Sequence, residues 1–184
     1  VEASRFGRQV RAAINGLVGD ELRLLGDPQA ITMTLRHLGE DVPATSWHVL
    51  KAWPKATSHL VVFLHGLCES DESWELGRRE RPTYAERIVE ETTGTPVMVR
   101  YNTGLHVSEN GQHLDELLEQ LVGAWPVAVT RITLVGHSMG GLVARAATNR
   151  ATVAGHQWKH LVSDVVCLGT PHAGAALEKA AHLG

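Results

Sequence analysis

One short run, Gly136-His137-Ser138-Met139-Gly140, restricts the folds that this chain can adopt more than any other. The apolar residues 132–135 before it are typical of a buried strand, and residues 142–147 after it are typical of a helix. A tight strand-to-helix turn brings the two elements so close that only glycine fits on either side. Such a turn lifts the central side chain over the carboxyl edge of the sheet. We therefore expect a parallel sheet with Ser138 at that edge.

Other apolar runs predict the rest of the sheet. Residues 59–64 are almost continuous in β-forming types, as in a strand covered on both faces. Residues 31–35 alternate apolar and polar types, which indicates a strand with one buried face. Further buried strands are expected at residues 96–100 and 164–168, and helices at residues 84–91 and 111–125. This alternation predicts an α/β fold whose mostly parallel sheet is flanked by helices.

The chain divides into a short N-terminal helical segment, residues 1–29, and an α/β core, residues 30–184. In the first segment, apolar residues recur at spacings of three and four: Phe6, Val10, Ala13, Ile14, Leu17 and Val18. We expect this stripe to pack against the core, with membrane contact as the alternative. At the other end, residues 173–182 have the pattern of a cap helix.

Composition excludes several classes of function. The 184 residues, 43% hydrophobic and 20% charged, have the composition of a globular domain, and a net charge of -3 without a basic stripe argues against nucleic acid as a partner. No apolar run reaches the length of a membrane span, and no signal peptide is visible, which favours a cytoplasmic location. The first residue is Val1, so an upstream signal stays open. Cys68 and Cys167 lie in apolar surroundings and are expected as buried thiols rather than a disulfide.

The residues around Ser138 suggest acyl transfer. In folds with this turn, a tetrahedral oxyanion is held by the amide after the nucleophile and by an amide from the loop after an earlier strand. With Ser138 as the nucleophile, Met139 supplies the first amide. We expect Leu67, in the turn that follows residues 59–64, to supply the second. His65 precedes Ser138 in the chain, so we interpret it as a structural hydrogen-bonding residue rather than as the base.

Several side chains are candidates for a substrate pocket. Tyr101 and Asn102 follow a strand at its carboxyl end, where parallel sheets keep their ligands. Two interpretations of Asn102 stay open, a place in the acyl pocket or a role in shaping a turn with Gly104. His137 and His172 are further pocket candidates. The tryptophans Trp74, Trp125 and Trp158 are expected in the core rather than on a lipid-facing surface.

Together the two loops resemble those of lipases and esterases of the α/β-hydrolase superfamily. A narrower resemblance, to a bacterial lipase-like subgroup related to inositol-deacylase (PGAP1-like) domains, covers about residues 30–180. It rests on Arg100-Tyr101-Asn102-Thr103-Gly104, Ser108-Glu109-Asn110-Gly111, Gly136-His137-Ser138-Met139-Gly140-Gly141 and Leu168-Gly169-Thr170-Pro171-His172. The resemblance implies hydrolysis of small-molecule or lipid esters through an acyl-enzyme on Ser138, without a metal or organic cofactor. It also implies that His172 belongs to a structural loop.

The acid and the base of a catalytic triad are not evident in the sequence. In the α/β-hydrolase fold the triad runs in the order serine, acid, histidine. The residues after Ser138 that qualify by type are Asp164, Glu178, His156, His160, His172 and His182. Asp164 opens its strand and is expected at the opposite edge of the sheet.

We therefore expect the chain to stop before the last strands of the fold, with the acid and base beyond Gly184. The 184 residues alone should then show little ester hydrolysis, because a serine without its imidazole is a poor nucleophile. Two alternatives stay open: acyl transfer to an alcohol or thiol at the same site, and a non-catalytic scaffold with this fold. Nothing in the sequence indicates the oligomeric state.

Overall fold

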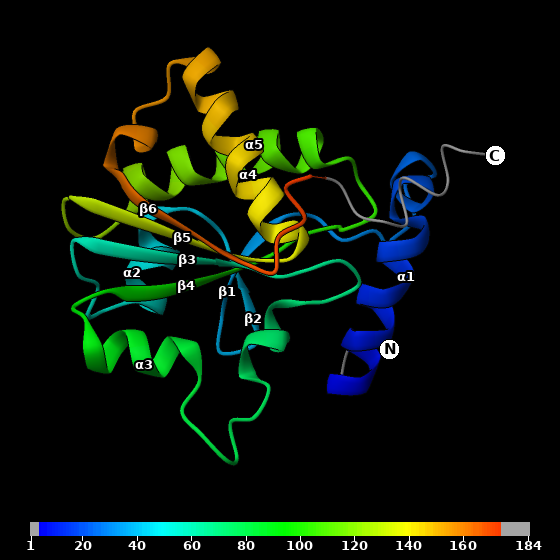
Figure 1. Ribbon diagram of the computed structural model, residues 1–184, viewed down its shortest axis with the longest axis horizontal. Helices are drawn as coiled ribbons and strands as arrows, with labels where there is room; N and C mark the ends of the chain where they lie inside the picture. Colours follow the sequence, from blue (N-terminus) through cyan, green and yellow to red (C-terminus); the bar gives the residue numbers. More distant parts are fainter. Residues whose placement is uncertain (1–3, 174–184) are drawn as a thin grey trace.

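The computed structural model describes residues 4–173, which form a six-stranded sheet in the order β2-β1-β4-β3-β5-β6. Helices α4 and α5 cover one face of the sheet and α3 covers the other (Figure 1). The strands are β1 (Thr34–His37), β2 (Glu40–Val42), β3 (His59–Leu64), β4 (Thr95–Arg100), β5 (Arg131–His137) and β6 (Val162–Leu168). The α-helices are α1 (Arg5–Leu24), α2 (Ser46–Ala52), α3 (Tyr84–Glu91), α4 (Val107–Ala124) and α5 (Met139–Ala154), and two 3-10 helices are η1 (Asp71–Glu75) and η2 (Trp158–Leu161).

Strands β4, β3, β5 and β6 are parallel, whereas β1 runs antiparallel to β4 and β2. The mostly parallel sheet flanked by helices is therefore confirmed. Leu64, the last residue of β3, pairs with Val99 of β4 and with Gly136 of β5. This register brings the loops after the three strands to the same edge, which is the edge where parallel sheets hold ligands.

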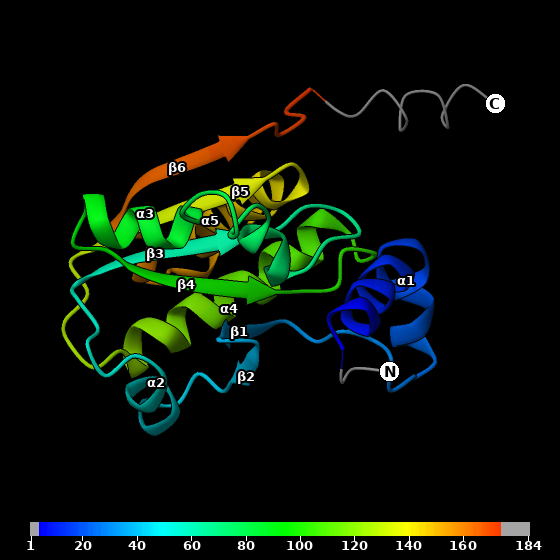
Figure 2. The ribbon, with the colours of Figure 1, turned by 90° about the horizontal axis from the view of Figure 1, so that it is seen from below.

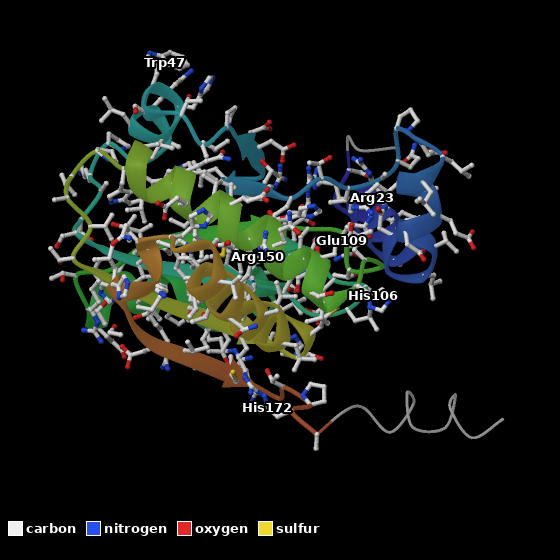
Figure 3. All side chains as sticks on the ribbon, turned by 90° about the horizontal axis from the view of Figure 1, so that it is seen from above. Arg23, Trp47, His106, Glu109, Arg150 and His172 are labelled. Carbon is white, nitrogen blue, oxygen red and sulfur yellow. The ribbon has the colours of Figure 1, made fainter. Side chains whose placement is uncertain are left out.

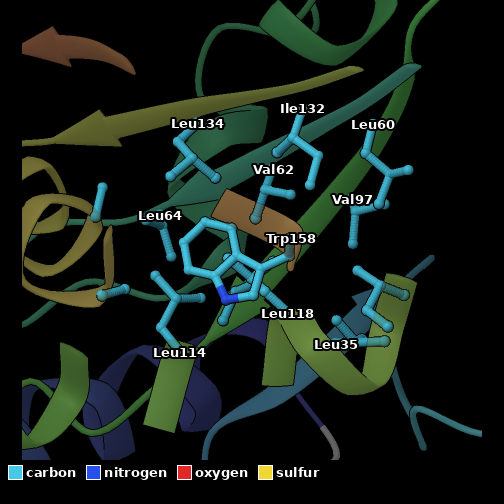
Figure 4. Close-up of a cluster of buried hydrophobic side chains, with 14 of the residues drawn as sticks. Leu35, Leu60, Val62, Leu64, Val97, Leu114, Leu118, Ile132, Leu134 and Trp158 are labelled. Atoms are coloured by element: carbon cyan, nitrogen blue, oxygen red, sulfur yellow. The ribbon is translucent and has the colours of Figure 1, made fainter. Parts of the chain in front are cut away.

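The core lies between the central strands and the helices α4 and α5. Figure 4 shows the ring of Trp158 among Val62, Leu64 and Leu114, and the ring is fully buried. Its Nε1 donates to Asp115 Oδ1 at 2.8 Å, so the indole is satisfied as well as packed. Trp74 and Trp125 are also buried, which confirms that these three tryptophans are core residues.

The first strand begins later than the alternation predicted, at Thr34 rather than at residue 31. The N–H of Ile31 donates to Asn15 Oδ1 of α1 at 2.8 Å, so this residue is bonded to a helix and not to a neighbouring strand. A tight hairpin then joins β1 to β2. Leu38 and Gly39 have φ angles of 50° and 83°, as a two-residue turn with both residues in the left-handed region requires.

Strand β6 is less covered than the sequence predicted. It lies at the edge of the sheet, and in the described part of the chain it pairs with β5 alone. Val165 and Val166 are consequently 39% and 40% exposed. The expectation that residues 164–168 are buried on both faces is wrong, because a continuous apolar run marks a strand but does not reveal its position in the sheet.

Helix α1 presents its apolar stripe to solvent. Phe6 is 75% exposed and Leu17 is 79% exposed, so the expected packing of this stripe against the core is wrong. The buried face consists of smaller residues: Gly7, Ala12, Asn15 and Gly19. A Cβ at Gly19 would collide with the Asn102 side chain, so the approach is too close for larger residues.

Helix α1 lies beyond the carboxyl ends of β3 and β4 (Figures 1 and 2). None of the helices within residues 4–173 combines the length and apolarity that crossing a membrane needs. The division at residue 29 stays a prediction. The cap helix expected over residues 173–182 lies, apart from its first residue, outside the described part of the chain.

Candidate active site

Ser138 occupies the turn between two regular elements. Strand β5 ends at His137 and helix α5 begins at Met139, so a single residue reverses the chain. Ser138 has φ 49° and ψ -116°, a region that residues with side chains rarely adopt. A Cβ at Gly140 would collide with the Leu64 carbonyl of β3, which explains why the turn needs glycine. The serine is thus held in a strained conformation by tightly packed neighbours.

A second contact fixes the turn from the side of β6. The Ser138 N–H donates to the Leu168 carbonyl at 2.8 Å. Next to it, a Cβ at Gly141 would collide with the Thr170 side chain. The loop after β6 therefore supports the turn, and it lies beside the first residues of α5.

Ser138 opens into a cleft of about 920 Å³ that Leu67 and Met139 also line. The structure therefore brings the expected nucleophile and both expected oxyanion residues to one cavity. Residues 103–108, between β4 and the first turn of α4, form another wall. A face of α5 completes it with Leu142, Arg145, Ala146 and Asn149. Sequence reasoning missed this face, although residues three and four apart on a helix share one side.

His65 and Tyr101 lie beneath the cleft instead of lining it. Both are buried, and their rings are stacked with centroids 4.3 Å apart. His65 Nδ1 donates to the Gly66 carbonyl at 3.0 Å, while Nε2 accepts from the Tyr101 N–H at 3.3 Å. Complete burial lowers the pKa of His65 to about 4, because the charged imidazolium would lose its hydration. His65 is therefore neutral near pH 7 and fully bonded.

Asn102 holds a turn and a helix together. Its Oδ1 accepts from the Gly104 N–H at 3.0 Å, and its Nδ2 donates to the Gly19 carbonyl of α1 at 2.8 Å. Of the two open interpretations, this geometry favours the turn. Asn102 lines a separate cavity of about 360 Å³ whose other walls are mainly residues 30–33 and α4. Near that cavity an ion pair joins Arg23 of α1 to Glu109 of α4 (Figure 3).

His172 is bonded to a residue of the cleft wall, whereas His137 has its partner outside the cleft. His172 Nδ1 accepts from Arg145 Nη1 at 2.8 Å, and His172 lies just beyond the end of β6 (Figure 3). His137 Nδ1 donates to Glu69 Oε2 at 3.0 Å. Glu69 was not among the sequence candidates, and no local pattern marks it.

In the described residues 4–173, the structure places no acid and base of a triad at the Ser138 hydroxyl. Within residues 4–173 no histidine is hydrogen-bonded to Ser138 Oγ. Asp164 accepts from Arg131 Nη2 at 2.7 Å, near the amino ends of β5 and β6, and this bond lowers the pKa of the Asp164 carboxyl. His156 is paired with Asp115, 2.7 Å away. Glu178 and His182 lie outside the described residues, so a base and acid further downstream stay a prediction.

Cys68 and Cys167 are free thiols. In the part of the chain that the structure describes, no three His, Cys, Asp or Glu side chains gather as metal ligands would. The site as described is thus one serine in a strained turn, beside a cleft with both apolar and polar walls.

The parallel sheet, the strand-turn-helix at Ser138 and the support of that turn by β3 and β6 define a protein of the α/β-hydrolase superfamily. The sequence pattern of the family described as "PGAP1-like alpha/beta domain" matches residues 55–183, well over half of the chain. The chain belongs to this family. The comparison with curated proteins gives no significant match.

Two solved structures of the lipase BlEst2 from Bacillus licheniformis are similar to the chain. The mature form is 24% identical over 66% of this chain and 44% of its own, with a TM-score of 0.47. The propeptide form is 20% identical over 82% of this chain and 28% of its own, with a TM-score of 0.48. The chain therefore spans less than half the length of either lipase chain.

Proposed function

We propose that this chain provides the nucleophile and the oxyanion site of a serine hydrolase that acts on carboxylic esters. The observation that carries the proposal is the backbone of Ser138, with φ 49° and ψ -116°, at the mouth of a cleft that Leu67 and Met139 also line. A strained turn that exposes one hydroxyl beside two backbone amides suits attack on a carbonyl carbon.

In the proposed reaction, Ser138 Oγ attacks the ester carbonyl and loses its proton to a histidine that the triad order places downstream. The carbonyl oxygen becomes an oxyanion, which the N–H groups of Leu67 and Met139 hold. The first amides of α5 add a favourable dipole, since the amino end of a helix stabilises negative charge. The C–O bond then breaks, and the leaving alcohol takes up the proton.

Water completes the cycle by attacking the acyl-enzyme on Ser138, which releases the carboxylic acid and restores the hydroxyl. The cleft walls indicate the substrate class. Leu67, Leu105, Met139 and Leu142 supply apolar surface for an acyl chain. A volume of about 920 Å³ has room for an ester larger than acetate.

The test is active-site labelling of the native protein with a fluorophosphonate, followed by digestion and mass spectrometry. The peptide that contains Ser138 should gain the phosphonyl mass, and Ser138→Ala should abolish both this label and the turnover of p-nitrophenyl esters. A serine outside the cleft, Ser46 at the start of α2, provides the control, because Ser46→Ala should retain both. Absence of label on Ser138 would favour a non-catalytic scaffold.

A further inference from the structure

A single carboxylate oxygen connects the two loops that carry the proposed oxyanion amides. Glu69 Oε2 accepts from the Gly66 N–H at 2.8 Å and from His137 Nδ1 at 3.0 Å. Gly66 directly precedes Leu67, and His137 directly precedes Ser138. The two bonds thus join the loop after β3 to the turn after β5 by way of one side chain.

The surroundings of this contact are tight and favour the charged form. A Cβ at Gly66 would lie 3.0 Å from His137 Nδ1 and 3.1 Å from Glu69 Oε2, so a side chain there would press on both partners. Partial burial acts to raise the pKa of Glu69, but the bonds from Gly66 and His137 outweigh it and keep this pKa below its usual value. The carboxylate is accordingly an acceptor at neutral pH.

The bridge that Glu69 forms between Gly66 and His137 bears on the distance between the Leu67 and Met139 amides, and stabilisation of an oxyanion depends on that distance. Two donors hold an oxyanion only when both point at the place where the oxygen develops its charge. The loop of Leu67 is held against the end of β4 by the bond from the Cys68 N–H to Thr103 Oγ1 at 3.1 Å, and against α1 by the close approach of Cys68 to Gly16. The turn at Ser138 is held by β3 and β6. Glu69 adds a direct link between the loop and the turn, which otherwise rest on different elements.

We propose that Glu69 is a positioning residue that sets the spacing between the Leu67 and Met139 amides through Gly66 and His137. The proposal rests on the proposed function, because it concerns the oxyanion site of that reaction. Glu69 touches neither the cleft nor the nucleophile, and its effect passes through its two partners.

The experiment measures p-nitrophenyl ester hydrolysis by the native protein and its variants. Glu69→Ala should lower kcat about 10- to 100-fold with KM changed less than about twofold, since a misplaced oxyanion donor weakens transition-state binding. Glu69→Gln keeps an oxygen that can accept both bonds and should recover most of kcat. A loss of stability alone would not produce this difference in kcat between equally folded variants.

The control is Glu86→Ala on α3. Glu86 Oε2 accepts from the Thr83 backbone N–H at 2.7 Å, so this variant also removes a carboxylate bonded to a backbone amide, but at a place away from the cleft. It should leave kcat unchanged.

His137→Ala removes one half of the bridge and should lower kcat as Glu69→Ala does. The double variant, Glu69→Ala with His137→Ala, should be no worse than either single one. The single variant His137→Ala also carries the test if Glu69→Ala fails to fold.

The positioning role is refuted if a folded Glu69→Ala or His137→Ala keeps the native kcat, or if Glu69→Gln is as defective as Glu69→Ala. Failure of the proposed function looks different. In that case Ser138 is not labelled in the native protein, and Ser138→Ala leaves ester turnover unchanged.

Discussion

The imidazole of His65 lies against the phenol ring of Tyr101, with the two planes 17° apart, and the Tyr101 hydroxyl donates to the His65 carbonyl at 2.5 Å. These contacts join the loop after β3 to the end of β4 under the cleft. Because His65 is fully buried, protonation would place a charge where water cannot reach it.

Protonation of His65 should destabilise the fold in mild acid. Its pKa is about 4 in the folded chain, against an ordinary value of 6.5 for an exposed histidine, so the unfolded chain binds the proton more tightly. The stability that this group contributes is present above pH 6.5 and is lost as the pH falls through 4, in total about 3 kcal/mol. Urea unfolding at about pH 7, 5.5 and 4 measures it. His65→Gln removes the titrating group, and an unchanged slope in this variant would contradict the prediction.

The pair of His156 and Asp115 should give the opposite pH dependence. The hydrogen bond to Asp115 raises the pKa of His156, so the folded chain binds this proton more tightly than the unfolded chain. Its contribution is complete below the unfolded pKa and is lost as the pH rises through the folded one. His156→Ala should therefore lower Tm more at about pH 6 than at about pH 9. Equal losses at both pH values would show that the ion pair contributes nothing.

Gly140→Ala should disrupt the turn at Ser138. The new Cβ would meet the Leu64 carbonyl, which belongs to the central strand and has no room to move. We expect a loss of about 1–3 kcal/mol and of fluorophosphonate labelling. The matched control is Gly123→Ala in α4, where a Cβ would meet nothing within 4 Å. That change should stabilise the helix by about 0.5–1 kcal/mol. Urea unfolding measures the stability of both variants, and fluorophosphonate labelling of the folded variants measures the state of the Ser138 turn.

Ser138→Gly should give a more stable protein than Ser138→Ala. Glycine adopts positive φ without the clash that a Cβ causes, and strained positions of this kind cost about 1–3 kcal/mol. Both variants lose the hydroxyl, so neither should hydrolyse esters. Urea unfolding of both variants measures the difference in stability. A midpoint of Ser138→Ala equal to or above that of Ser138→Gly would show that the backbone at position 138 is not strained.

The parts of the fold that could be predicted are those set by short stretches of sequence. The strand of residues 59–64 and the helix of residues 84–91 have the expected bounds, because a continuous apolar run and a capping Thr83 act locally. The turn at Ser138 was equally visible, since its glycines are neighbours in the chain.

The features that could not be predicted depend on residues far apart in the sequence. The spacing of Phe6 and Leu17 correctly indicated an amphipathic helix, but the buried side was decided by the close approach of the loop at Asn102, which admits only small residues. Glu69 meets His137 across 68 positions. Nothing near Glu69 in the sequence announces that contact.

The conformation of Ser138 also bears on which residue selection would favour at position 138. If the turn served only to connect β5 with α5, drift under selection for thermal stability would favour glycine at this position, where its backbone is unstrained. Serine at this position therefore costs stability that glycine would not cost. A population of random variants selected for heat resistance alone should therefore accumulate glycine at position 138. A population selected for both heat resistance and ester turnover should keep serine there.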